Sequence, residues 1–242
     1  FFGDALAHAI LPGVAVGYLI SGGSRSSLFW WGLATAVLTA VAIGSVTREA
    51  RIKEDTAIGI MFAGMFALGI ALISTARSYA VDLAHFLFGN VLGVGRSDLW
   101  LTAIFGVLVL LLVFVFFKEF LVLSFDPILA QTLRLPVRPL EYLLLILIAV
   151  TIVVSLQTVG VALMVAMLVT PAASAHLLTR RLPSMMILGA AFGAVSGVAG
   201  LYLSYYSRIA SGAAIVLVCT GLFLVAFLVS PRRHRALRSG AR

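Results

Sequence analysis

The sequence predicts an all-α polytopic membrane protein, with a bundle of about eight transmembrane helices, one half-inserted segment and one short cytoplasmic helix. Of its 242 residues, 62% are hydrophobic and 11% are charged, whereas soluble domains have roughly 45–50% and 25%. The apolar residues form runs that reach about 17–25 residues, which is enough to cross a bilayer. The basic residues lie mainly between these runs. We therefore expect one transmembrane domain over residues 1–242.

Eight spans are expected. They lie near 1–20, 28–46, 55–75, 98–117, 141–156, 159–178, 184–205 and 212–230. The fifth and sixth come from one overlong run, which we divide at 155–160 because polar residues and glycine there permit a turn. The fifth span is short, so a broken or re-entrant arrangement remains open. Residues 83–95 are too few to cross and contain several glycines, which favours a half-inserted segment.

Lysine and arginine predict the orientation of these spans. Thirteen of the 17 basic residues fall in alternate connections, near 48–53, 118–138, 180–181 and 232–242. The positive-inside rule places these connections and the C-terminus in the cytoplasm. The same distribution accounts for the net charge of +8 without a nucleic-acid partner. We expect a multi-pass membrane protein in contact with lipid.

Several small residues within the later spans indicate helix packing. Gly189, Gly193 and Gly197 repeat at a four-residue spacing, which lets transmembrane helices approach closely and predicts packing rather than chemistry. The single cysteine, Cys219, lies in an apolar run and is expected to be a packing residue.

The first span contains an aspartate and a histidine, Asp4 and His8, in an apolar run. Their four-residue spacing places both on one helical face. Ionisable residues in a membrane span are costly, so they persist mainly beside an aqueous path, a partner or an ion. Carboxylate oxygen and imidazole nitrogen suit manganese, iron or zinc, which indicates a cation site. The alternative is that Asp4 caps the helix and His8 is an interior histidine with its hydrogen bonds satisfied.

The longest connection between spans runs from Lys118 to Glu141 and predicts a short helix. Asp126 followed by Pro127 is typical of a helix start, and we expect Pro136 and Pro139 to limit the helix to about two turns. Its apolar residues are Ile128, Leu129 and Leu133. They can enter a groove of a soluble partner or rest on lipid, and the residues alone do not decide between these.

Six segments in order along the chain resemble the membrane permease of the manganese, zinc and iron ABC importers. They are Gly-Asp-Ala-Leu-Ala-His and its continuation at 3–13, Glu-Asp-Thr-Ala-Ile-Gly-Ile at 54–60, Asp-Leu-Ala-His-Phe-Leu-Phe-Gly-Asn at 82–90, Ser-Phe-Asp-Pro at 124–127, Gln-Thr-Val-Gly at 157–160 and Thr-Pro-Ala-Ala at 170–173. The resemblance covers essentially the whole chain.

The resemblance implies a complex in a bacterial cytoplasmic membrane, with two permease copies (a homodimer or a pair with a close paralogue), two cytoplasmic ATPase subunits and an extracytoplasmic metal-binding protein. It implies that Asp4 and His8 are metal ligands and that the segment near 126–134 is the coupling helix seated in the ATPase. Asp82 and His85 are a second pair that we expect to serve entry or gating. Members of this family usually carry a further helix before the Gly-Asp motif, so we expect sequence upstream of residue 1.

The substrate expected from the resemblance is divalent manganese, with zinc or iron as alternatives, and no cofactor is expected to remain bound. The chain is expected not to be an enzyme, because it has no Gly-x-x-x-x-Gly-Lys-Ser/Thr phosphate loop. A membrane metalloenzyme is disfavoured, since glutamate occurs only at 49, 54, 119 and 141, in or beside cytoplasmic connections. An ATP-independent channel or ion-coupled carrier remains the other class.

Overall fold

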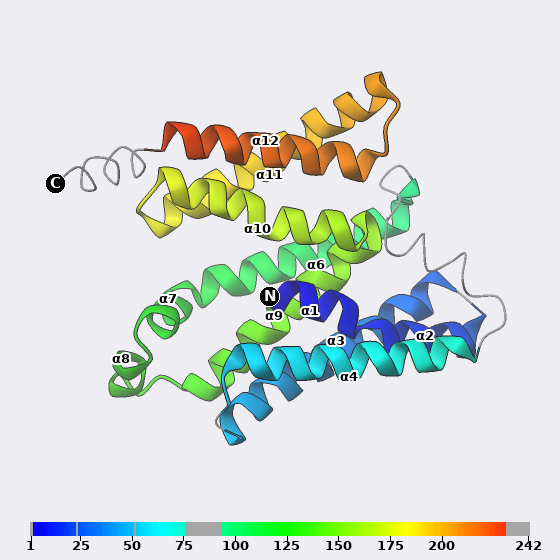
Figure 1. Ribbon diagram of the computed structural model, residues 1–242. Helices are drawn as coiled ribbons and strands as arrows, with labels where there is room; N and C mark the ends of the chain where they lie inside the picture. Colours follow the sequence, from blue (N-terminus) through cyan, green and yellow to red (C-terminus); the bar gives the residue numbers. More distant parts are fainter. Residues whose placement is uncertain (1, 23, 51, 76–92, 231–242) are drawn as a thin grey trace. The chain divides into compact units, whose positions relative to one another are not determined.

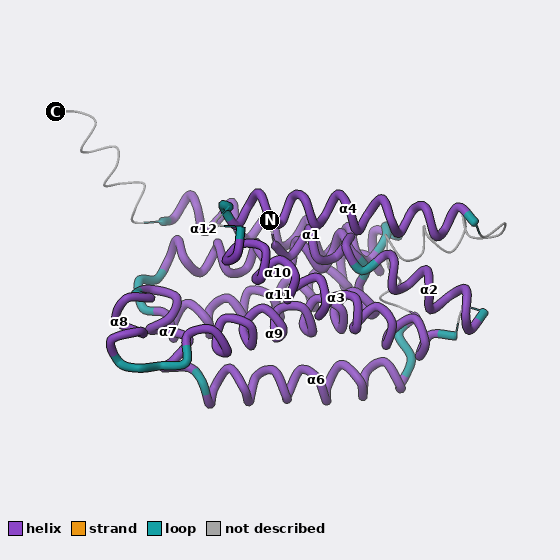
Figure 2. The backbone as a smooth tube through the Cα atoms, turned by 90° about the horizontal axis from the view of Figure 1, so that it is seen from below, coloured by secondary structure: helices purple, strands orange, loops and turns teal. Residues whose placement is uncertain are grey.

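The protein is described by a computed structural model that covers residues 2–22, 24–50, 52–75 and 93–230. All regular structure in these ranges is helical, with short loops between helices (Figures 1 and 2). The helices are α1 (Phe2–Ala9), α2 (Leu11–Ser21), α3 (Arg25–Glu49), α4 (Glu54–Ser74), α6 (Arg96–Val115), α7 (Phe117–Phe125), α8 (Pro127–Thr132), α9 (Val137–Val159), α10 (Val161–Leu178), α11 (Leu182–Ser207) and α12 (Ser211–Val229). Within the described residues, eight helical stretches are long and apolar enough to cross a membrane, which confirms the predicted number of spans.

The chain divides into two compact units. Helices α1–α4 and α6–α9 belong to the first unit, and α10–α12 belong to the second. In the first unit, α2 packs against both α3 and α4, and α1 packs against the same two helices. The predicted site therefore lies on a short helix held between two long ones.

The first span is interrupted at Ile10, between α1 and α2. Pro12 lies in the first turn of α2. Proline has no N–H, so the helical bond from residue 12 to the carbonyl of His8 cannot form. The span predicted near 1–20 is confirmed as one span, Phe2–Ser21, and Ile10 keeps helical backbone angles, so the break between α1 and α2 is the loss of this one hydrogen bond within the span.

In the second half of the first unit, a buried cluster joins the helices before and after α8. It contains Phe120 and Leu123 of α7 with Leu140 and Leu147 of α9, and residues of α6 pack against it. At the start of α6, the Gly95 amide donates to Asp98 at 3.0 Å, and the Gln157 amide of α9 donates to the same carboxylate at 3.3 Å. The buried Asp98 thus caps α6 and ties it to the end of α9.

In the second unit, α10, α11 and α12 contact one another pairwise. The stripe Gly189, Gly193 and Gly197 faces α10 at ordinary van der Waals distances of 3.7–4.0 Å for an added Cβ, which agrees with the predicted packing role. Closer contact occurs at Gly200, where a Cβ would lie 2.4 Å from the Cα of Ile215 in α12. Cys219 is buried, as expected of a packing residue.

The fifth span, predicted near 141–156, is confirmed as a continuous helix of 23 residues, Val137–Val159, which excludes the open alternative of a broken or re-entrant arrangement. Pro139 lies in its first turn, where a missing N–H costs little. The prediction that prolines end the short helix was wrong. The short helix α8 ends before Pro136 and Pro139: Arg134 adopts a φ of 56°, and the Leu135 amide donates to the Ala130 carbonyl at 3.0 Å. This is a Schellman-type ending, which needs no proline. Helix α7 was not predicted at all.

Candidate functional site

Asp4 and His8 lie one turn apart on α1, on the same face, as their spacing predicts. His8 Nδ1 is 2.9 Å from the Asp4 backbone oxygen and 3.6 Å from Asp4 Oδ1. A carbonyl oxygen only accepts hydrogen bonds, so Nδ1 carries the proton in this contact. The neutral ring then has its lone pair on Nε2, the form in which histidine binds metals.

Two phenylalanines of α4 also contact the His8 ring. The ring centroids of Phe62 and Phe66 lie 5.7 and 5.9 Å from that of His8, and both contacts are edge-to-face. The phenylalanines stack on each other at 5.7 Å. The imidazole is therefore oriented by Asp4 from its own helix and by two rings from α4, which is the kind of support that fixes a ligand before an ion arrives.

Two glycines, Gly13 of α2 and Gly69 of α4, allow close helix contacts around the break between α1 and α2. A Cβ on Gly13 would lie 2.1 Å from Thr35 Oγ1 and 2.3 Å from the Trp31 carbonyl oxygen, both in α3. A Cβ on Gly69 of α4 would lie 2.6 Å from Leu11. Glycine thus allows α3 and α4 to touch the backbone at the break. His8 sits in the last turn of α1, and its carbonyl lacks the helical donor that Pro12 cannot supply.

A buried hydroxyl lies at the level of this break. Thr39 of α3 is 2% exposed, and its Oγ1 has no hydrogen-bond partner among the described residues. Thr35 and Thr47 of the same helix instead donate to the carbonyls four residues earlier. Since Gly13 meets Thr35, and Ala5 shares a buried cluster with Ile43, the antiparallel pairing brings Thr39 opposite Ala9. A buried hydroxyl without a hydrogen-bond partner lowers the stability of the folded protein by about 1–3 kcal/mol. The hydroxyl of Thr39 therefore destabilises the fold.

The pair is an incomplete ligand set by itself. Within the part of the chain that the structure describes, no group of three or more His, Cys, Asp and Glu side chains is gathered. First-row divalent ions commonly take four to six ligands. The carboxylate of Asp4 is 56% exposed and the His8 side chain 24%, so both remain open to further groups. Asp82 and His85 lie outside the described residues.

The predicted helix start at Asp126 is confirmed. The Leu129 amide donates to Asp126 Oδ1 at 2.9 Å, and Pro127 is the first helical residue. Three large apolar side chains of α8 and its C-cap are exposed, Ile128 by 77%, Leu129 by 44% and Leu133 by 56%, whereas Ala130 is buried. Such exposure on a six-residue helix leaves a small apolar surface available for a partner or for lipid.

Sequence reasoning missed most of the residues that position the site. Phe62, Phe66, Gly69 and Thr39 lie in spans where aromatic, small and hydroxyl residues are common, so no local pattern marked them. Gly13 belongs to the motif at 3–13, but the motif did not indicate its close contact with α3. The four-residue spacing of Phe62 and Phe66 places them on one face of a helix, but it does not indicate which partner they face.

Comparison with known proteins gives consistent results. A family model described as the ABC 3 transport family matches residues 1–230. The manganese transport system membrane protein MntC of Halalkalibacterium halodurans is 50% identical over 231 residues, which cover 96% of this chain and 78% of that protein. MntC of Listeria innocua is 53% identical over 96% of this chain and 81% of that protein. A chain in the structure of PsaBC from Streptococcus pneumoniae in complex with Fab superposes with a TM-score of 0.82 at 42% identity, covering 98% of this chain and 84% of that one.

Proposed function

The chain belongs to the ABC 3 transport family as a metal-type permease, and we propose that it is the membrane-spanning subunit of an ATP-driven manganese importer. The observation that carries this proposal is the Asp4–His8 pair beside a helix break, in a chain whose relatives are named manganese transport proteins. The family match runs over 1–230, which supports one permease domain over residues 1–242.

In this proposal, the carboxylate of Asp4 and Nε2 of His8 replace part of the hydration shell of the ion in the membrane. Oxygen and nitrogen ligands together suit divalent manganese, and also zinc and iron. A second copy of the permease would supply an equal pair and bring the number of such ligands to four. A set of this kind can bind the ion and also release it, as conduction requires. Asp82 and His85 remain a proposed entry or gating pair.

We propose that energy enters through α8. The 242-residue sequence contains no phosphate loop, so ATP hydrolysis is assigned to a separate cytoplasmic subunit that receives Ile128, Leu129 and Leu133. Leu129→Asp would force a charge into that apolar contact, at a cost of several kcal/mol if the charge stayed buried. The permease should then lose its ATPase in pull-down experiments, whereas the control Gln131→Glu, an exposed polar residue on the same helix, should keep it. Normal uptake by Leu129→Asp with ATPase attached would assign α8 to the lipid surface.

The proposed orientation places α8 and the C-terminus in the cytoplasm and the α2–α3 connection outside. In a Cys219→Ala background, Ser24→Cys should react with an impermeant thiol reagent added to intact cells, and Gln131→Cys should not. The reverse pattern would invert the orientation. The outer face is also where a metal-binding protein would deliver the ion.

The decisive experiment is metal uptake into vesicles that contain the permease with its ATPase. We expect ATP-dependent uptake of manganese in preference to zinc and iron. Stronger uptake of zinc or iron would keep the class and change the substrate. Equal uptake with a hydrolysis-deficient ATPase would instead assign the chain to channels or ion-coupled carriers.

A further inference from the structure

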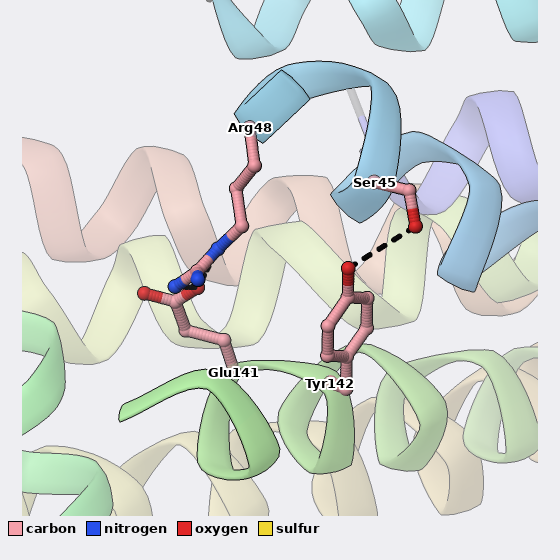
Figure 3. A network of polar contacts seen from close by, with 4 residues as sticks. All are labelled: Ser45, Arg48, Glu141 and Tyr142. Carbon is pink, nitrogen blue, oxygen red and sulfur yellow. Dashed lines mark hydrogen bonds and ion pairs between the residues drawn. The ribbon is translucent and has the colours of Figure 1, made fainter. Parts of the chain in front are cut away.

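Two polar contacts join the end of α3 to the start of α9, 93–97 positions apart in the sequence (Figure 3). Arg48 donates from Nε at 2.9 Å and also from an Nη nitrogen to Oε2 of Glu141. The hydroxyls of Ser45 and Tyr142 lie 3.1 Å apart. Ser45 already donates its only proton to the Val41 carbonyl, so Tyr142 donates to Ser45. We call these four residues the α3–α9 joint.

The joint is packed as well as hydrogen-bonded. A Cβ on Gly44 would lie 2.9 Å from Leu145 and 3.0 Å from the Tyr142 ring, both in α9. The α3 residues 44, 45 and 48 share one face, and so do the α9 residues 141, 142 and 145. The two helices therefore meet along about one turn, with the ion pair at one end.

On the α9 side, the joint adjoins the buried cluster against which the segments before and after α8 pack. Leu140 and Leu147 of α9 are in the same buried cluster as Phe120 and Leu123 of α7, the helix just before α8. The loop after α8 also packs against this cluster through Leu135. A displacement of α8 is therefore expected to act, through this buried cluster, on the first turns of α9.

On the α3 side, the joint is continuous with the helices around Asp4 and His8. Ile43 of α3 is in one buried cluster with Ala5 of α1 and with Ala57 and Ile58 of α4. Phe62 packs against that cluster and also contacts the His8 ring. The joint thus lies between the base of α8 and the surroundings of the candidate metal site.

We propose that Arg48, Glu141, Ser45 and Tyr142 are positioning residues that couple movement of α8 to the helices that hold Asp4 and His8. This inference rests on the proposed function. Arg48 and Glu141 are 33% and 37% exposed, and ion pairs of this exposure contribute little to stability. Their removal should leave the protein folded while the two helices move independently.

The test is the amount of manganese taken up per ATP hydrolysed, measured in vesicles that contain the permease and its ATPase. Arg48→Glu and Glu141→Arg should each lower this ratio about tenfold, within the range for residues that link two sites. The double exchange restores opposite charges and should bring the ratio back to within about twofold of the unmodified protein. The matched control is Arg138→Glu, which makes the same charge change in the first turn of α9 at an exposed side chain outside the joint.

Several results would overturn the inference. They are an unchanged ratio in both single variants, an equal loss in Arg138→Glu, or no recovery in the double exchange although the ATPase stays bound. If charge reversal prevents assembly, Tyr142→Phe, which removes one hydroxyl, decides the matter: a lowered ratio supports the joint and an unchanged ratio refutes it. Failure of the unmodified complex to take up manganese would instead refute the proposed function, and the inference with it.

Discussion

The first span, Phe2–Ser21, and the span Arg96–Val115 are of equal length but differ sharply in burial. Within an apolar 18-residue window of each span, 67% is buried inside the protein in the first, against 6% in the second. The buried span carries Asp4, His8, Pro12 and three glycines, whereas the exposed one presents large apolar side chains such as Phe114, which is 84% exposed. In a membrane, lipid is as apolar as any core, so small and polar residues mark the protein interior and apolar runs mark its outer surface.

The largest effect on transport should come from replacing Asp4 or His8, the ionisable pair in the buried span. Asp4→Asn and His8→Ala should each lower manganese uptake by well over tenfold, because even partners of metal ligands are commonly worth about 10–100-fold. Uptake is measured in vesicles, and ATPase pull-down checks assembly. The control is Leu108→Ala in the exposed span. Near-normal uptake by either site variant would return Asp4 and His8 to capping and packing roles.

The second-largest effect, on stability, should come from replacing a glycine of each span by alanine. Gly13→Ala should destabilise the protein by about 1–3 kcal/mol, because its Cβ would meet the Trp31 carbonyl oxygen at 2.3 Å. Gly106→Ala in the exposed span has open space around its Cβ and should be neutral or stabilising by up to about 1 kcal/mol. Thermal unfolding in detergent measures both. Equal effects at the two positions would contradict the difference in packing.

A smaller effect is expected where an aromatic ring positions His8. Phe66→Leu keeps the position apolar and removes one edge-to-face contact, worth about 0.5–1.5 kcal/mol. We expect KM for manganese to rise about two- to tenfold with a smaller change in the maximal rate. The comparison is Phe114→Leu, a ring that faces outward. An unchanged KM in Phe66→Leu would show that the Asp4 contact alone suffices to orient the imidazole.

The smallest effect is expected at the unpaired hydroxyl. Thr39→Val replaces it by a methyl group of similar size, so thermal stability should stay constant or rise by about 1 kcal/mol. Thr35→Val, which removes a hydroxyl bonded to the Trp31 carbonyl, should not raise it. A clear loss of stability in Thr39→Val would reveal a partner for this hydroxyl, such as a bound water.

The sequence by itself determined the features that depend on local chemistry or on the bilayer. The eight spans lie within a few residues of their predicted positions, because the thickness of the hydrocarbon core sets the length of an apolar run. The start of α8 followed from Asp126 and Pro127, and the division of the long run near Gly160 agrees with its positive φ of 79°. The four-residue spacing likewise put Asp4 and His8 on one face.

Only the tertiary structure decided which spans are buried and which residues support the pair. Helices that face lipid are apolar on most sides, so periodicity does not tell a lipid-facing side from a packed one. The contacts of His8 with Phe62 and Phe66, of Gly13 with α3, and of Arg48 with Glu141 join residues distant in sequence. Each depends on how two helices are placed side by side, which no local pattern in this chain specifies.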